Sequence, residues 1–89
     1  MQGCHSEYTW YLDSGCSKHM TGCKSLLCDF RKCLGPIVTF GDASEGKTEG
    51  YGVLTNGLLT FRRVSYVNGL KHNLMSVSQL CDAGYEVRF

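Results

Sequence analysis

The residues with the clearest chemical potential are Asp13, Ser14 and Gly15, which directly follow an apolar run that ends at Leu12. A strand that ends in this way delivers a carboxylate to a tight loop, because Gly15 lets the backbone turn sharply. Ser14 adds a hydroxyl that can hydrogen-bond within the loop. Burying a carboxylate is costly unless it accepts hydrogen bonds or shares a proton with a second acid. The position of Asp13 therefore indicates either a structural turn or an acid–base site.

An acid–base site of this kind needs a second carboxylate. Two close carboxylates cannot both ionise, so one acts as a base toward water and the other as an acid toward the substrate carbonyl. None of the other aspartates, Asp29, Asp42 and Asp82, is followed by Ser-Gly or Thr-Gly. An aspartic site would thus pair Asp13 with Asp13 of a second copy across a two-fold axis. The alternative is a turn residue whose carboxylate accepts backbone N–H bonds.

Two rival chemistries involve cysteine and histidine. Cys16, His19, Cys23 and Cys28 lie within thirteen residues and are all possible zinc ligands. Their spacing is not one of the common zinc signatures, so we expect no metal. A Cys16 nucleophile assisted by His19 or His72 is the second alternative.

The other cysteines carry no motif. Six cysteines are many for this length, and we expect no secretion signal. Reduced thiols or a metal site are therefore favoured over a disulfide framework. We expect Cys28, Cys33 and Cys81 to be small, buried apolar side chains.

Length and charge exclude several classes of partner. A chain of 89 residues forms one domain, and a domain this small is stabilised by a metal, a disulfide or a partner subunit. The formal net charge is +1 and no basic run exceeds two residues, so we expect no nucleic-acid partner. No apolar stretch approaches the ~20 residues of a membrane span, and we expect no membrane partner.

The elements that must position Asp13 are mostly strands. Residues 1–7 are polar and predict a linker or arm, and residues 8–89 predict a single domain. Asn56-Gly57 and Asn68-Gly69 are turn signals, and Gly50 and Gly52 predict a strand that another backbone approaches closely. Residues 25–30 have the spacing of a short helical turn. The predicted strands cover residues 8–12, 37–40, 47–54, 58–61 and 63–67.

The pattern changes to a helical period near the C-terminus. Leu70, Leu74, Val77 and Leu80 share one helical face, which predicts a helix over about 72–82 that ends before Gly84. Residues 85–89 alternate apolar and charged side chains, which predicts a half-buried final strand. The fold class is therefore mainly β: a small closed or partly open barrel with one C-terminal helix and a terminal strand.

Three separated blocks of the sequence form one pattern: Trp10, 12–17 and 19–22 in the first block, 38–42 in the second and 67–80 in the third. These blocks resemble the protease segment of copia-type retrotransposon polyproteins, a retropepsin-like aspartic protease. They occur in the family's order, and the resemblance spans about residues 10–89. Asn68 stands where the family usually has Pro.

The resemblance implies a homodimeric aspartic endopeptidase that cleaves its own polyprotein and uses no cofactor. Asp13 of each subunit would form the catalytic pair, with Ser14 and Gly15 orienting it. The same resemblance implies that Cys16, Ser17 and His19 support the active-site loop.

The resemblance also implies how the chain meets its partners. The terminal strand, with Tyr85, Val87 and Phe89, would pair with its symmetry mate in the dimer. The substrate would be a polyprotein peptide, and the location would be cytoplasmic, in virus-like particles. We expect the segment that closes over substrate to lie between Cys23 and Pro36.

A second hypothesis needs no catalysis. The chain would keep the β-barrel of such a protease and serve as a dimerisation or zinc-binding module.

Overall fold

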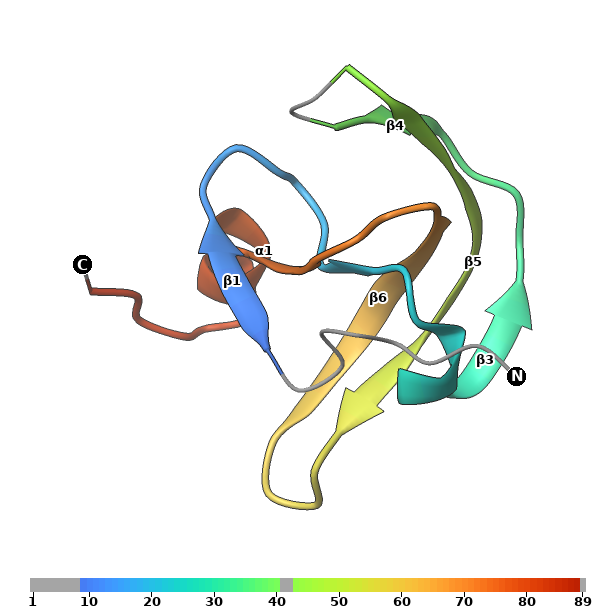
Figure 1. The fold of residues 1–89 in the computed structure, drawn as a ribbon. Coiled ribbons are helices and arrows are strands. Elements are labelled where there is room, and N and C mark those ends of the chain that lie inside the picture. The colour runs from blue at the N-terminus through green and yellow to red at the C-terminus, as the bar shows by residue number, and fades with distance from the viewer. Residues whose placement is uncertain (1–8, 41–42, 89) are drawn as a thin grey trace.

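A single mixed sheet forms the fold of the computed structural model, which describes residues 9–40 and 43–88. Its strands are β1 (Trp10–Asp13), β2 (Met20–Thr21), β3 (Cys28–Lys32), β4 (Ile37–Thr39), β5 (Glu45–Thr55), β6 (Thr60–Asn68) and β7 (Asn73–Ser76). A 3-10 turn, η1, covers Lys24–Leu26, and a helix, α1, covers Val77–Asp82. The strands pair in the order β1-β7-β2-β6-β5-β3, with β4 added beside β5 (Figure 1). The predicted mainly β, barrel-like fold with one C-terminal helix is confirmed.

The predicted arm over residues 1–7, the start of the first strand at Tyr8 and the last residue, Phe89, lie outside the described residues. Within the described part of the chain, no helix is long and apolar enough to cross a membrane.

The hairpin of β5 and β6 is the longest pairing of the sheet. Its turn falls at Asn56-Gly57 as predicted: Gly57 has a φ of +92°, and Asn56 Oδ1 accepts the N–H groups of Leu58 and Leu59, each at 2.9 Å. The close approach at Gly52 is also confirmed, because a Cβ there would lie 3.1 Å from the carbonyl oxygen of Cys28. Strand β3 can therefore pair tightly against β5.

Strand β1 is an edge strand that carries the Asp13 motif. It runs parallel to β7, with Trp10 opposite Asn73 and Asp13 opposite Ser76. Strand β7 also pairs with β2, and β2 with β6. This register brings the end of β1 beside the start of α1, so the Asp13 loop and the helix N-terminus are neighbours.

The core of the domain mixes apolar and hydrogen-bonded side chains. Thr21, fully buried, donates its hydroxyl to Asn73 Oδ1 at 2.6 Å, and Asn73 Nδ2 donates to the carbonyl of Thr9 at 3.0 Å. No buried side-chain N or O atom of the described residues lacks a partner. The buried apolar residues are Met20, Cys23, Val64, Val67 and Leu80, and the buried polar residues are His19, Thr21, Thr48, Ser65, Asn73 and Ser76.

The helix prediction over 72–82 was wrong at its start. Residues 73–76 form β7, because their backbone pairs with β1 on one side and β2 on the other. Ser76 then begins α1 as its N-cap, and its hydroxyl accepts the N–H of Gln79 at 3.1 Å. The end is as predicted: Gly84 has a φ of +93°, and the N–H of Tyr85 donates to the carbonyl of Leu80 at 3.0 Å.

Two further predictions about chain conformation need correction. The helical turn expected over 25–30 is limited to η1, because β3 starts at Cys28, opposite Val53 of β5. The strands expected over 58–61 and 63–67 form one strand, β6, with a register shift near Arg62 and Arg63.

The terminal strand over 85–89 is not formed in this chain. Residues 85–88 have no regular structure, and the chain runs away from the sheet after α1 (Figure 1). A strand requires a neighbour for its backbone groups, and no strand of the described chain lies beside the tail.

The cysteines also differ from expectation. Cys28, Cys33 and Cys81 are exposed free thiols rather than buried apolar side chains. Cys28 and Cys33 lie in and just after β3, on the outer edge of the sheet, and Cys81 is in the last turn of α1. Reduced thiols or a metal site were expected for the cysteines. Cys23 differs, because its sulfur is disulfide-bonded.

Candidate active site

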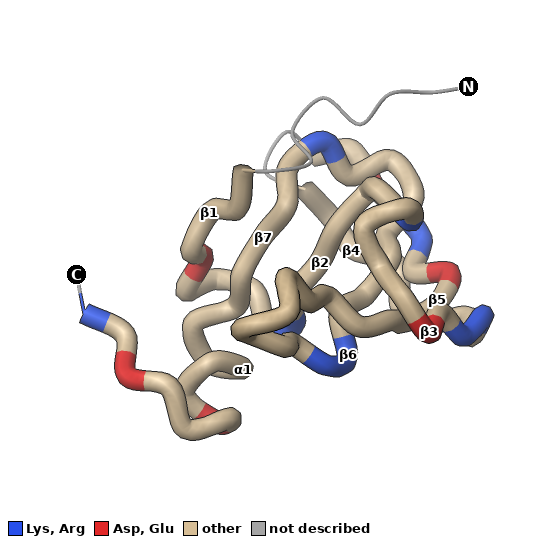
Figure 2. Tube along the Cα trace, turned by 90° about the horizontal axis from the view of Figure 1, so that it is seen from below, with Lys and Arg blue, Asp and Glu red and all other residues tan. Residues whose placement is uncertain are grey.

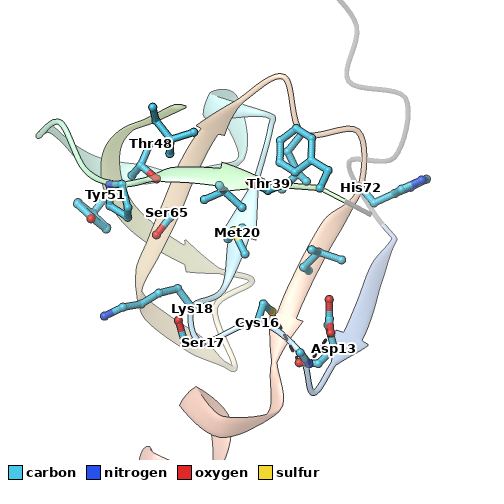
Figure 3. Close-up of a pocket in the computed structure, with 17 residues that line it drawn as sticks. Asp13, Cys16, Ser17, Lys18, Met20, Thr39, Thr48, Tyr51, Ser65 and His72 are labelled. Atoms are coloured by element: carbon cyan, nitrogen blue, oxygen red, sulfur yellow. Dashed lines mark hydrogen bonds between the residues drawn. The ribbon is translucent and has the colours of Figure 1, made fainter. Parts of the chain in front are cut away.

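A cleft of about 610 Å³ opens beside the end of β1. Asp13 lies at one end of it, and Tyr51 of β5 at the other (Figure 3). The wall opposite the Asp13 loop includes residues 36–40, which comprise β4 and its flanks. Met20, Leu70 and Leu74 add apolar side chains to the lining, whereas Lys18, Thr48, Ser65 and His72 add polar ones. The cleft is thus mostly apolar, with a carboxylate at one end.

Among the described residues that line the cleft, Asp13 is the only Asp or Glu. It is half-buried, and the N–H of Gly15 donates to its Oδ1 at 2.7 Å. A Cβ on Gly15 would lie 3.1 Å from that oxygen, so glycine leaves the carboxylate in place. Among the described residues, no other group hydrogen-bonds the carboxylate. The turn geometry fixes Asp13, and residues 9–40 and 43–88 place no second acid on the cleft.

Cys16 points into the cleft beside Asp13 (Figure 3). Its thiol donates to the Asp13 carbonyl at 3.6 Å. Burial raises the pKa of the Cys16 thiol, and the negative charge of Asp13 raises it further. The thiol therefore stays protonated at neutral pH, which is unfavourable for a nucleophile.

His19 lies beneath the loop with 2% of its surface exposed. Its Nδ1 accepts the N–H of Ser76 at 2.9 Å, and its own backbone N–H donates to Gln79 Oε1 at 2.9 Å. A ring nitrogen used in this way cannot take a proton from Cys16. His72, the other histidine proposed as a base, lies on the cleft wall with its ring edge-on to Tyr11. The Cys–His alternative is therefore not supported.

Ser76 and Gln79 hold the Asp13 loop, and sequence reasoning missed both. The Ser76 hydroxyl donates to the carbonyl of Cys16 at 2.9 Å. Gln79 Nε2 donates to the carbonyl of Arg62 at 3.2 Å, which ties the helix to β6 as well. The signal was present: Ser76 followed three residues later by Gln79 is the spacing of a capping box.

The remaining predicted site residues fall in different places. Ser17 is exposed and lines the cleft, whereas Ser14 is exposed and does not. Tyr85 packs against Phe61, with ring centroids 5.7 Å apart, and Val87 is half-buried.

The four possible zinc ligands do not converge. Within residues 9–40 and 43–88, no three His, Cys, Asp or Glu side chains are grouped so that they could hold a metal ion. Cys28 Sγ instead donates to the carbonyl of Val53 at 3.4 Å, across the β3–β5 pairing.

The segment expected to close over substrate, between Cys23 and Pro36, is mostly not the one that borders the cleft. Of residues 23–36, only Pro36 lines the cleft, and the facing wall continues through β4 to Phe40. Strand β4 pairs with β5 in register Thr39 to Glu45, so these two strands form a hairpin beside the cleft.

His19 predicts how stability depends on pH. Burial lowers the pKa of His19 below its ordinary value, so the unfolded chain binds a proton that the native chain does not. The free energy of unfolding is then expected to decrease as the pH falls below ~6.5. His19→Asn keeps an acceptor near the Ser76 N–H and removes the titration. Urea unfolding at several pH values should show a shallower acid dependence for this variant, and identical slopes would contradict the prediction.

Comparison with known proteins agrees with this fold. The sequence matches the family described as Pol polyprotein, beta-barrel domain, over residues 10–85. No curated protein and no solved structure matches the chain. The match covers all seven strands and the helix. The chain therefore belongs to the Pol polyprotein β-barrel domain family.

Proposed function

We propose that this domain is a homodimeric aspartic endopeptidase that processes its own retroelement polyprotein, as in copia-type elements. The observation that carries the proposal is Asp13, the single carboxylate that the described residues place on the wall of a mostly apolar cleft. One carboxylate activates water poorly, whereas two that share a proton provide both a base and an acid. The cleft is therefore half of a catalytic site, and a second copy supplies the other half.

The edge of the sheet supports a dimer on the Asp13 side. Within residues 9–40 and 43–88, strand β1 pairs only with β7, so these residues leave its other edge open. Tyr11 and Leu12 on β1 are 49% and 52% exposed. An open edge with exposed apolar side chains favours association with another chain. In the dimer, the tail with Tyr85, Val87 and Phe89 would pair with its symmetry mate, which would supply the strand neighbour that residues 85–88 lack in the single chain.

The proposed reaction divides its roles between the two subunits. One Asp13 carboxylate accepts a proton from a water molecule, and that water attacks the peptide carbonyl carbon. The other Asp13, protonated, donates to the carbonyl oxygen, and the resulting intermediate expels the amine after it is protonated. The Gly15 N–H holds Asp13 Oδ1, while Ser76, His19 and Gln79 hold the loop from below. The substrate is a polyprotein peptide, cleaved inside the cell in virus-like particles.

The concentration dependence of activity tests this proposal. The rate of cleavage of a fluorogenic peptide with apolar residues around its central bond is measured at mildly acidic pH over a range of protein concentrations. Specific activity should rise with concentration and level off where sedimentation shows that dimers predominate. A monomer that cleaves at full specific activity would contradict the shared site.

The second candidate is a non-catalytic dimerisation module. The open edge of β1 favours it equally, because Tyr11 and Leu12 would be covered in any dimer. A stable dimer that cleaves none of the peptides would establish the module and overturn the endopeptidase.

A further inference from the structure

Two grooves border the Asp13 cleft. The β3 groove, of about 590 Å³, lies against β3, β5 and β6 and shares Tyr51 with the cleft. The α1 groove, of about 480 Å³, lies between β6 and α1 and shares Ser17 and Lys18 with the cleft. Arg62 and Arg63 line both grooves. Each groove therefore adjoins the cleft at a shared residue, and the two grooves meet at the same pair of arginines.

These surfaces carry an excess of positive charge. The grooves are lined by four cationic residues, Lys18, Arg31, Arg62 and Arg63, and by two acidic residues, Asp29 and Asp82. All four cationic residues are exposed, and Figure 2 shows the basic stretch on β6. The only ion pair among the described residues joins Arg88 to Glu86 in the tail. No carboxylate of the described chain is thus within ion-pairing distance of the groove cations.

The backbone of the β3 groove is irregular on both sides. Arg63 has a φ of +61° and Asp29 a φ of +51°, a region that residues other than glycine rarely adopt. Each lies at a register shift, one between β5 and β6 and the other between β3 and β5. Bulges of this kind change the direction of side chains and occur frequently beside binding sites.

We propose that the two grooves bind an acidic segment of the polypeptide substrate that flanks the cleaved bond. The proposal rests on the proposed endopeptidase function and names a feature of its substrate. Charge complementarity favours carboxylates, because guanidinium groups pair with them in a planar, two-bond geometry. Each groove also shares a lining residue with the cleft, Tyr51 in one and Lys18 in the other, which favours a peptide over a nucleic acid because an extended peptide bound in the cleft can reach the adjoining grooves.

Binding to an inactive protein tests the proposal separately from catalysis. The probe is a fluorescein-labelled peptide with an apolar centre and a run of glutamates at one end, compared with the same peptide carrying glutamines. With Asp13→Asn protein, the glutamate peptide should bind about tenfold more tightly at low salt, and added salt should reduce the difference. Equal affinities for the two peptides would overturn the proposal.

Charge variants locate the site. Arg62→Gln combined with Arg63→Asn removes both β6 charges, and asparagine tolerates the positive φ at position 63. The ratio of the two affinities should fall toward one in this variant. Lys32→Gln combined with Lys47→Gln removes the same charge from exposed positions that line neither groove, and it should keep the ratio. An equal loss in both double variants would show a general charge effect and overturn the site.

Two outcomes distinguish a groove for an acidic substrate segment from a nucleic-acid site and from a peptide-binding site without catalysis. A single-stranded RNA oligonucleotide that binds more tightly than the glutamate peptide, with loss in the arginine variant, would overturn the peptide proposal in favour of nucleic acid. Glutamate-dependent binding without any cleavage by the unmutated protein would keep the acidic-segment site and refute only the endopeptidase.

Discussion

Replacing Asp13 with asparagine is expected to abolish peptide cleavage and to leave the fold intact. The change removes the only carboxylate that the described residues place on the cleft, and with it both members of the proton-sharing pair in a dimer. We expect cleavage to fall by at least about a thousandfold. Asparagine keeps an Oδ1 that can accept the Gly15 N–H, so the loop should retain its turn. Activity is measured on the fluorogenic peptide, and folding by urea unfolding.

The control for this experiment is Glu45→Gln, which removes a carboxylate from an exposed position at the start of β5. It should leave cleavage within about twofold, because a surface charge outside the site has a small effect. Residual cleavage by Asp13→Asn protein at near the original rate would place the chemistry elsewhere. If the Asp13→Asn protein did not fold, the hydrogen bonds of His19, Ser76 and Gln79 would not be sufficient to hold the loop. That result would contradict the role given to these residues above.

Gly22→Ala is expected to produce the largest loss of stability. A Cβ on Gly22 would overlap the carbonyl oxygen of Leu70 and come within 2.9 Å of its carbonyl carbon. The backbone at Leu70 cannot easily move aside, because its N–H donates to the carbonyl of Val67 at 3.2 Å. We expect the free energy of unfolding to fall by about 3 kcal/mol or more, which is a large part of the stability of a small domain.

Gly15→Ala provides the matched comparison for stability. The nearest atom to a Cβ at that position is Asp13 Oδ1, the end of a side chain, at 3.1 Å. A side chain can shift where a backbone carbonyl cannot, so the loss should stay below about 1 kcal/mol. Urea unfolding of both variants measures the difference. Similar losses would mean that the contact between Gly22 and Leu70 is not rigid.

The sequence predicted the site best where the chemistry is local. The Asp-Ser-Gly order at the end of a strand was sufficient to predict the loop, because the Asp13 to Gly15 hydrogen bond spans two residues. The residues that support this loop were harder to predict from the sequence, because Ser76 and Gln79 are separated from it by about sixty residues. The opposite wall of the cleft, residues 36–40, depends on β4 pairing with β5, and the local sequence does not specify where such a hairpin lies relative to β1.

The fold also divides into features that the local sequence predicts and features that depend on pairing with distant segments. The Asn56-Gly57 hairpin and the Gly84 helix end follow from local conformational preferences, and both were correct. Residues 73–76 have a helical hydrophobic period but become a strand, because pairing with β1 and β2 outweighs that preference. A tail strand over 85–89 was predicted from alternation alone, and alternation supplies no pairing partner.

The parallel pairing of β1 with β7 also governs when the domain can be completed during translation. Trp10 is synthesised well before its partner, Asn73. Contacts between such distant segments form slowly, because a long loop must close first. The Asp13 loop acquires its supports only after Ser76 and Gln79 have been synthesised. A nascent chain therefore carries Asp13 on an unsupported loop until the segment that contains β7 and the start of α1 has been made.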